Sequence, residues 1–197
     1  MKYWKVVAVG IFVALLLAGP IHSLFTDVAL SENNEIGSGE FDIAISKDGS
    51  RFYNDLKLFD FSGLKPGDER TFTFYVKNRG DIDVSRLAMV IYVKDLEDGS
   101  LSPAEKLVDN TSEEGELSKY LIVRELKAYL GNTSWEVSSV SGKSLRDING
   151  SEVELINRPM KEGEVLRVTM TVRFSENAGN ECQTDKVLVD LKLNAEQ

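Results

Sequence analysis

The stretch VLRVTMTVRF, residues 165–174, alternates apolar and polar side chains without interruption. Apolar residues take every second position from Leu166 to Phe174, and arginines and threonines stand between them. Successive side chains of a β-strand point to opposite faces, so a period of two predicts a strand with one face turned toward a core. The rest of the chain repeats this pattern.

Further stretches predict strands for the same reason. Residues 40–46 and 71–77 alternate, and residues 87–93 are almost wholly apolar, as in a strand buried on both faces. In residues 186–193, Val187, Val189, Leu191 and Leu193 share the face expected to point inward. Residues 121–130 fit either a helix or a strand, and their β-branched start favours the strand.

The turns between these stretches are also marked in the sequence. Pro66 and Gly67 suit the second and third positions of a type II turn, and Gly163 lies in a similar corner before the strand at residues 165–174. Residues 103–107 predict one helical turn, and residues 144–148 a short helix. Seven to nine strands with almost no helix predict an all-β fold, a jelly-roll or β-sandwich in a single domain.

The N-terminus has the layout of a signal peptide, predicted to span residues 1–23. Lys2 and Lys5 precede an uncharged apolar run at residues 6–18, which is shorter than the roughly 20 residues that cross a bilayer. Small Ser23 offers a cleavage site, which makes Leu24 the first mature residue. The alternative is an uncleaved membrane anchor. The prediction is therefore a secreted protein that meets the membrane only transiently.

The new N-terminus reads as a strand over residues 24–30, with Leu24, Val28 and Leu30 on one face. A strand that begins at the first mature residue has no upstream partner, so it must pair with a later part of its own chain or with another molecule. The predicted donor strand consists of Leu24, Phe25, Thr26, Asp27, Val28, Ala29 and Leu30. The jelly-roll domain is expected over residues 32–197, with a variable insertion around 95–157.

Composition narrows the possible chemistry. The chain has 23 Lys and Arg against 32 Asp and Glu, a net charge of −9, which disfavours nucleic acid as a partner. His22 is the sole histidine and lies in the predicted signal peptide; Cys182 is the sole cysteine. Such a mature chain is poorly equipped for zinc or for a Ser-His-Asp arrangement, so no cofactor and no catalysis are predicted. Cys182 is expected to be a small buried residue, with a cross-link between chains as the alternative.

Two acidic groups offer an alternative to this metal-free prediction. Asp81 with Asp83, or Asp95 with Glu97 and Asp98, could hold Ca²⁺, although acidic loops are usually only solvated.

Asn110, Asn132 and Asn149 each begin an N-glycosylation acceptor pattern, and in a secreted chain they are candidate glycan sites.

Several of these pieces together resemble the TasA/camelysin family. They are Phe25-Thr26-Asp27 at the mature start, the strand at residues 37–43, the corner at residues 64–68, Asn180-Glu181-Cys182-Gln183, and the closing Ala195-Glu196-Gln197. The resemblance implies a jelly-roll subunit of a secreted fibre, as in biofilm-matrix filaments and archaeal bundling pili. In such fibres the N-terminal strand of one subunit completes the sheet of the next, which is donor-strand complementation.

The partner implied by this resemblance is the protein itself, in a head-to-tail homopolymer with lateral filament contacts, serving a biofilm matrix or contact between cells. The alternative is a monomeric cell-surface adhesion or binding domain with residues 24–30 folded back as an ordinary edge strand. Camelysin-like proteins are associated with metallopeptidase activity, but the chain has no His-Glu-x-x-His motif. The sequence therefore predicts that the protein is not an enzyme.

Overall fold

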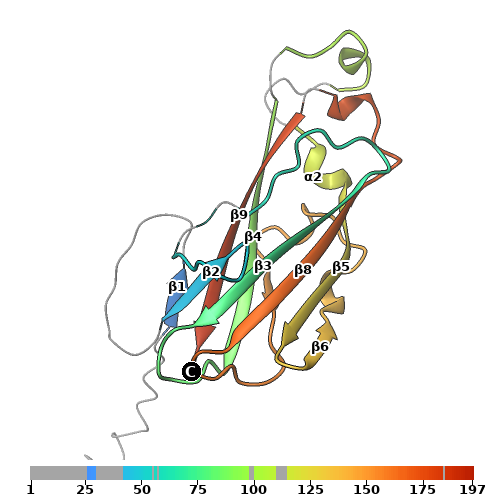
Figure 1. Cartoon of the computed structure of the whole chain (residues 1–197). Coiled ribbons are helices and arrows are strands. Elements are labelled where there is room, and N and C mark those ends of the chain that lie inside the picture. The colour runs from blue at the N-terminus through green and yellow to red at the C-terminus, as the bar shows by residue number, and fades with distance from the viewer. Residues whose placement is uncertain are drawn as a thin grey trace, which may run out of the picture.

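The computed structural model describes residues 26–29, 42–54, 56, 58–97, 100–109, 115–183 and 185–197. In these residues two antiparallel sheets pack face to face, with strand orders β1-β9-β4-β7 and β2-β3-β8-β5-β6 (Figure 1). The strands are β1 (Thr26–Ala29), β2 (Ile43–Ser46), β3 (Glu69–Asn78), β4 (Arg86–Glu97), β5 (Leu121–Leu130), β6 (Thr133–Glu136), β7 (Glu152–Glu154), β8 (Val165–Phe174) and β9 (Asp185–Glu196). The predicted all-β sandwich is confirmed.

Helical structure in the described residues is limited to single turns. The short helix α2 spans Leu117–Tyr120, and the 3-10 turns are η1 (Glu105–Leu107), η2 (Ser138–Val140) and η3 (Asn180–Cys182). None of the helices in the described part of the chain is long and apolar enough to cross a membrane. The helical turn predicted at residues 103–107 is present as η1.

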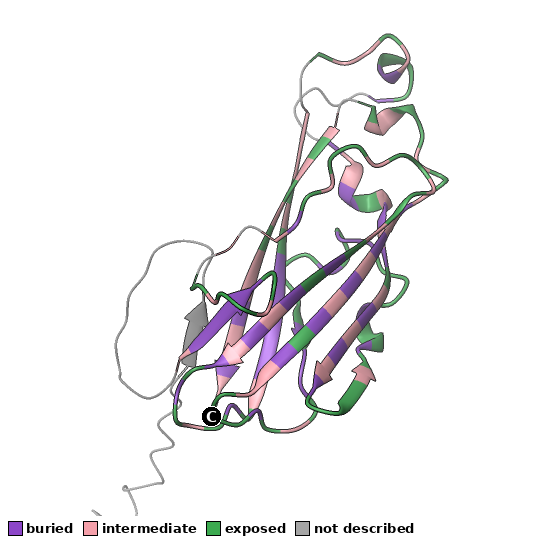
Figure 2. Ribbon diagram, in the orientation of Figure 1, coloured by how far each residue is buried: buried purple, intermediate pink, exposed green. Residues whose placement is uncertain are grey.

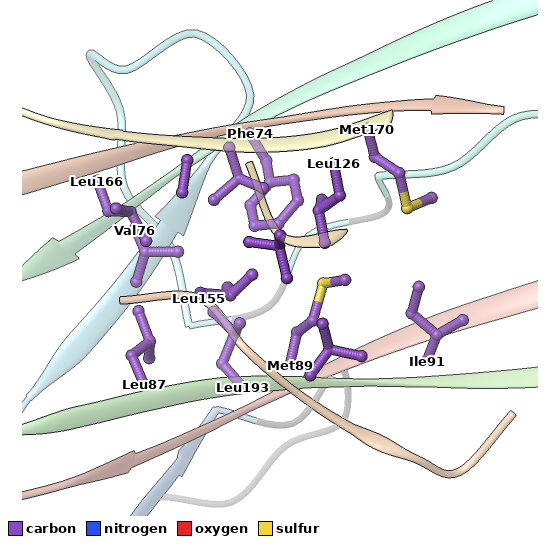
Figure 3. Packing of buried hydrophobic residues seen from close by; sticks show 14 of the residues in the cluster. Phe74, Val76, Leu87, Met89, Ile91, Leu126, Leu155, Leu166, Met170 and Leu193 are labelled. Carbon is purple, nitrogen blue, oxygen red and sulfur yellow. The ribbon is translucent and has the colours of Figure 1, made fainter. Parts of the chain in front are cut away.

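The core fills the space between the inner faces of the two sheets. Burial alternates along β3 and β8, as the period of two predicts, and residues 87–91 of β4 are buried on both faces (Figure 2). Apolar side chains from both sheets interdigitate around Leu155 (Figure 3). Those labelled in Figure 3 are Phe74, Val76, Leu126, Leu166 and Met170 from one sheet and Leu87, Met89, Ile91 and Leu193 from the other.

The two predicted corners have the same construction. Gly67 has φ +95°, and the Asp68 N–H donates to the Lys65 carbonyl at 2.9 Å, the bond that closes a four-residue turn. In the second corner Gly163 has φ +72°, and the Glu164 N–H donates to the Lys161 carbonyl at 3.0 Å. A positive φ strains any side chain with a Cβ, so glycine is the residue that suits both positions.

The helix predicted at residues 144–148 is wrong. These residues form successive turns, in which the Ser144 hydroxyl donates to Oδ2 of Asp147 at 2.7 Å. One bond of the helical type forms, from the Ile148 N–H to the Ser144 carbonyl at 3.3 Å, but it does not extend into a helix, and Leu145 and Ile148 are buried. Residues 95–157, expected to be a variable insertion, contain β5, β6 and β7, which belong to the two sheets.

Candidate functional site: an open strand edge and a carboxylate cluster

Strand β9 is paired along its whole length on one side and over a short segment on the other. It pairs with β4 from Arg86↔Glu196 to Glu97↔Asp185. On its other side β1 pairs with its last four residues, from Thr26↔Glu196 to Ala29↔Leu193. Within the described part of the chain, residues 185–192 have no strand partner on this side. They present the unpaired backbone groups that characterise an open sheet edge.

A groove of about 770 Å³, lined by both apolar and polar residues, runs beside this open edge. One wall is β9, and the other consists of residues 56 and 58–64, which precede β3. Phe59 and Phe61 pack their rings on Phe72, with centroids 5.2 and 4.9 Å apart, which gives that wall a firm aromatic base. The groove therefore has a firm aromatic wall and a lining of mixed polarity, and it lies next to the unpaired backbone groups of the β9 edge.

The expected inward face of β9 is confirmed, but it is not buried along its whole length. Val187, Val189 and Leu191 pack against the core cluster as predicted, yet they are only half-buried and also line the groove, whereas Leu193 is fully buried. Leu188 on the opposite face is 44% exposed. The period of two gives the correct direction for these side chains, but the facing sheet does not cover this half of β9.

The predicted donor strand falls partly within the described residues. Residues 26–29 form β1, and Leu24, Phe25 and Leu30 lie outside the described part of the chain. In this structure β1 pairs with β9 of its own chain, which is the folded-back arrangement held as the alternative. Its place on β9 immediately adjoins the open edge at residues 185–192.

A second feature lies where β4 and β9 meet α2, at the end of the sandwich away from the C-terminus (Figure 1). Carboxylate oxygens of Glu97, Glu116 and Asp185 lie within 4.8 Å of one another, and so do oxygens of Glu97, Glu105 and Asp109. Glu97 and Asp185 are register partners on β4 and β9, and Glu116 immediately precedes α2. Asp185 also lines the groove, so the carboxylate cluster and the groove share one residue.

The cluster is unusual because much of it is removed from water. Glu105 is fully buried and Asp109 is 7% exposed. Burial raises the pKa of Asp185 to about 7, with the neighbouring carboxylates of Glu97 and Glu116 adding to the rise, and the hydrogen bond from the Glu116 N–H opposes it. Like charges packed this closely in a partly buried site disfavour full ionisation, so the cluster needs protons or a cation to balance it.

Two local details show how tightly the backbone encloses Asp185. The Glu116 N–H donates to Oδ2 of Asp185 at 2.5 Å, whereas the buried Oδ1 receives no hydrogen bond from the described residues. A Cβ at Gly115 would lie 2.9 Å from both Cγ of Asp185 and the Leu96 carbonyl oxygen. Glycine at this position therefore allows the chain to approach the carboxylate.

The donors in this cluster fit a hard cation. All of them are oxygens, the ligands that Ca²⁺ and Mg²⁺ prefer. The described residues contain no histidine, and burial raises the pKa of the Cys182 thiol to about 12, so neither usual class of zinc ligand is supplied. A metal bound by the described residues would thus be held by carboxylates.

The acidic groups suggested by the sequence are only partly brought together. Asp81 and Asp83 are exposed and belong to neither carboxylate group. Asp95 instead accepts from the Ser118 N–H at 2.8 Å and pairs with Arg146 at 3.1 Å. Glu97 joins the cluster, and Asp98 lies outside the described residues. Sequence reasoning missed Glu105, Asp109, Glu116 and Asp185, because residues this far apart carry no common motif.

The candidate glycan sites differ in their surroundings. Asn132 is exposed in the turn between β5 and β6. The Asn149 side chain accepts from the Val93 N–H at 2.9 Å and donates to the Val93 carbonyl at 3.3 Å, so its amide is held against β4. Asn110 lies outside the described residues. Glycosylation at these three positions stays a prediction.

Fold and site together define an antiparallel β-sandwich whose N-terminal strand sits on the edge of its C-terminal strand, beside a cluster of carboxylates. A family model described as camelysin metallo-endopeptidase matches residues 3–197. The chain therefore belongs to the TasA/camelysin family, as its resemblance implied. Membership indicates a secreted or surface protein. A search of curated proteins finds no match.

The family corrects the expectation that the protein is not an enzyme. Its description as a metallo-endopeptidase points to peptidase activity. The expectation rested on the missing His-Glu-x-x-His motif and on the scattered positions of Asp and Glu in the sequence. Folding gathers several of those carboxylates into one cluster, and such a cluster leaves no short motif to find.

Proposed function

We propose that the protein is a subunit of an extracellular filament, in which the N-terminal strand of one copy pairs with β9 of the next. The observation that carries this proposal is the open edge of β9 at residues 185–192, bordered by a partly apolar groove and adjoining the place where β1 lies. A strand added there would satisfy the free backbone groups and cover the half-buried side chains of the groove.

The predicted donor strand has the size and chemistry for this role. Seven extended residues, 24–30, reach roughly 23 Å at about 3.3 Å per residue. Burial of Leu24, Val28 and Leu30 would contribute on the order of 5–8 kcal/mol before ordering costs are subtracted. The donor and acceptor surfaces are different parts of the chain, so the contact is head to tail, and repetition without closure gives an open filament. The resemblance to the family supports a role of such a filament in a biofilm matrix or in contact between cells.

The test locks β1 onto its own chain before assembly. In a Cys182→Ser background, Thr26→Cys with Glu196→Cys places two thiols on register partners, whose Cα atoms lie about 4.5–5.5 Å apart, within disulfide range. The matched control, Thr26→Cys with Ser139→Cys, puts the second cysteine at an exposed position of η2, beside β5, away from β1 and from the open edge of β9.

The reduced proteins and the oxidised control should form filaments in negative-stain electron microscopy. The oxidised Thr26→Cys/Glu196→Cys protein should stay monomeric until a reductant is added. Deletion of residues 24–30 should leave a folded monomer. Filaments that form equally well from the locked protein would refute strand exchange. Reduced protein that remains monomeric at every concentration and ionic strength would favour the monomeric surface domain.

A second candidate function is a metal-dependent endopeptidase, as the family is described. Asp185 favours it, because this residue lies both in the carboxylate cluster and in the lining of a groove where an extended peptide could add to β9. A bound metal would polarise a peptide carbonyl or a water molecule. Cleavage of an unfolded protein substrate should then stop with a chelator and in Glu97→Gln, but not in Asp81→Asn, which alters an exposed carboxylate outside the cluster and the groove. Chelator-resistant cleavage would exclude this site.

A further inference from the structure

We propose that the outer face of β3, β8 and β5 binds an acidic polysaccharide, with Arg167 pairing with a carboxylate of the sugar chain and Tyr129 supporting the arginine. Exposed or half-buried side chains alternate with buried ones along each of these strands, and they form the face turned away from the other sheet (Figure 2). The three strands belong to the sheet that does not contain β9. The proposal therefore does not depend on filament assembly or peptidase activity.

Arg167 is the residue that points to a ligand. Its guanidinium lies over the ring of Tyr129, with Cζ 4.0 Å from the ring centroid. Arg167 is exposed and makes no ion pair with any described residue. Other basic residues of this face do pair with carboxylates, namely Arg124, Lys127 and Arg173. A guanidinium that lies flat on an aromatic ring keeps the N–H groups of its edge available for two parallel hydrogen bonds to a carboxylate.

The neighbours of Arg167 give this face groups that suit a sugar chain. In register, Arg167 lies between Tyr75 on β3 and Tyr129 on β5, and the next row of the same face places Thr169 beside Thr73. Neighbouring strands lie about 4.8 Å apart, so a row across three strands covers about 10 Å. Aromatic rings, hydroxyls and a guanidinium are thus presented together, and they match the ring faces, hydroxyls and carboxylates of an acidic sugar.

The charge of this face is opposite to that of the whole chain. The chain carries a net charge of −9. On the outer face of β3, β8 and β5, however, five basic side chains accompany two carboxylates, those of Glu69 and Glu125. The basic residues are Lys77, Arg124, Lys127, Arg167 and Arg173. An excess of positive charge attracts an anionic polymer and gives no such attraction to a neutral one.

An extended peptide fits this face less well than a glycan does. Strand β8 pairs with β3 on one side and with β5 on the other, so it offers no free edge for strand addition. The strongly exposed large apolar side chains of the described residues also lie elsewhere in the fold. Recognition on this face would therefore come from polar and aromatic side chains alone.

The experiment titrates the purified protein with sodium alginate, a polymer of uronic acid sugars, in a calorimeter and in the presence of EDTA. Binding should be saturable and should weaken as NaCl is added, because salt screens exposed charges. Dextran, an uncharged sugar polymer, should give no binding heat. Polyglutamate, an acidic polymer without sugar rings, should bind at least about tenfold more weakly than alginate, because it offers no ring faces or hydroxyls.

Variants of one exposed residue connect the binding to this face. Arg167→Ala and Arg167→Lys should each weaken alginate binding by at least about tenfold, since lysine keeps the charge but lacks the planar fork. Both should keep the melting temperature of the unmodified protein, because the side chain is exposed. The control, Lys94→Ala, removes a positive charge from an exposed position of β4 in the other sheet and should bind like the unmodified protein.

Four results would overturn the proposal. Three are alginate binding that is absent, that is retained by Arg167→Ala, or that polyglutamate matches. The fourth is self-association of the protein without alginate that Arg167→Ala abolishes, because the face would then be occupied by a second copy of the chain.

Discussion

The replacement of Asn78 is expected to be costly, because its side chain links the two sheets at one end of the sandwich. Asn78 is fully buried at the end of β3. Its Nδ2 donates to the Ile82 carbonyl at 2.8 Å and to the Met160 carbonyl at 3.1 Å, and its Oδ1 accepts the Gly80 N–H at 3.1 Å. These bonds hold the turn that carries the chain from β3 into β4.

The magnitude follows from those three bonds. Each contributes about 1 kcal/mol net. The Met160 carbonyl also accepts the Val84 N–H, and the Gly80 N–H also reaches the Asp42 carbonyl, so two of the three partners keep another bond. Asn78→Ala should therefore destabilise the fold by about 2–3 kcal/mol, which lowers the melting temperature by about 4–12 °C for a domain of this size.

A matched pair of variants makes this prediction specific to the hydrogen bonds. Asn78→Asp keeps the acceptor but turns a carboxylate oxygen toward two carbonyl oxygens, so at neutral pH it should be less stable than Asn78→Ala. Asn177→Ala, at an exposed position, is the control and should change little. Differential scanning fluorimetry measures all three. The reasoning is refuted if Asn78→Ala has the same melting temperature as the control, or if Asn78→Asp has the same melting temperature as the unmodified protein.

Two further outcomes are expected. Burial raises the pKa of the Cys182 thiol to about 12, so the thiol stays protonated and iodoacetamide should alkylate it at least about tenfold more slowly in the native protein than in urea; equal rates would contradict this. Hydrogen bonds from Arg158 at 2.8 and 2.9 Å lower the pKa of Glu164 below its ordinary 4.5. The ionised Glu164 carboxylate therefore stabilises the fold at pH values above its ordinary pKa. This stabilisation is lost as the pH falls through the lowered pKa of the folded protein. The melting temperature should drop more steeply on acidification in the unmodified protein than in Glu164→Gln, and parallel curves would count against the pairing.

The strands and corners could be predicted because their signals are local. Alternation in residues 165–174 reports which side chains share a face, and the buried face of β8 agrees with it. The corners before β3 and β8 follow from glycine at a position that needs a positive φ. In both corners the acidic residue after the glycine also accepts a backbone N–H, from Lys65 to Asp68 at 2.9 Å and from Lys161 to Glu164 at 2.8 Å. This local closure explains why the two corners look alike in the sequence.

The carboxylate cluster could not be predicted, because it depends on register between distant segments. Glu97 and Asp185 become neighbours only through the pairing of β4 with β9. Glu105 would be assigned to the surface by its residue type, yet it is fully buried, with its carboxylate accepting the Ser102 N–H at 3.0 Å. The buried hydrogen bonds of Asn78 could not be predicted for the same reason. The sequence indicates a turn at this position, but it does not show which carbonyl groups the turn brings to the Asn78 amide.

The open edge of β9 is both free to pair with another strand and selective in the strand that it would accept, two properties that usually conflict. An exposed edge strand invites indiscriminate pairing, and proteins commonly suppress this with charged side chains. On β9 the exposed positions include Lys186 and Asp190, and these charged residues border the groove together with the half-buried Val187 and Val189. Such an edge would reject a strand that is apolar on both faces and accept one that is apolar on a single face. The segment at residues 24–30 meets this condition only in part, because Leu24, Val28 and Leu30 share one face while Phe25 and Ala29 flank Asp27 on the other. Under the proposed assembly, Asp27 would be the residue that gives the second face its polarity.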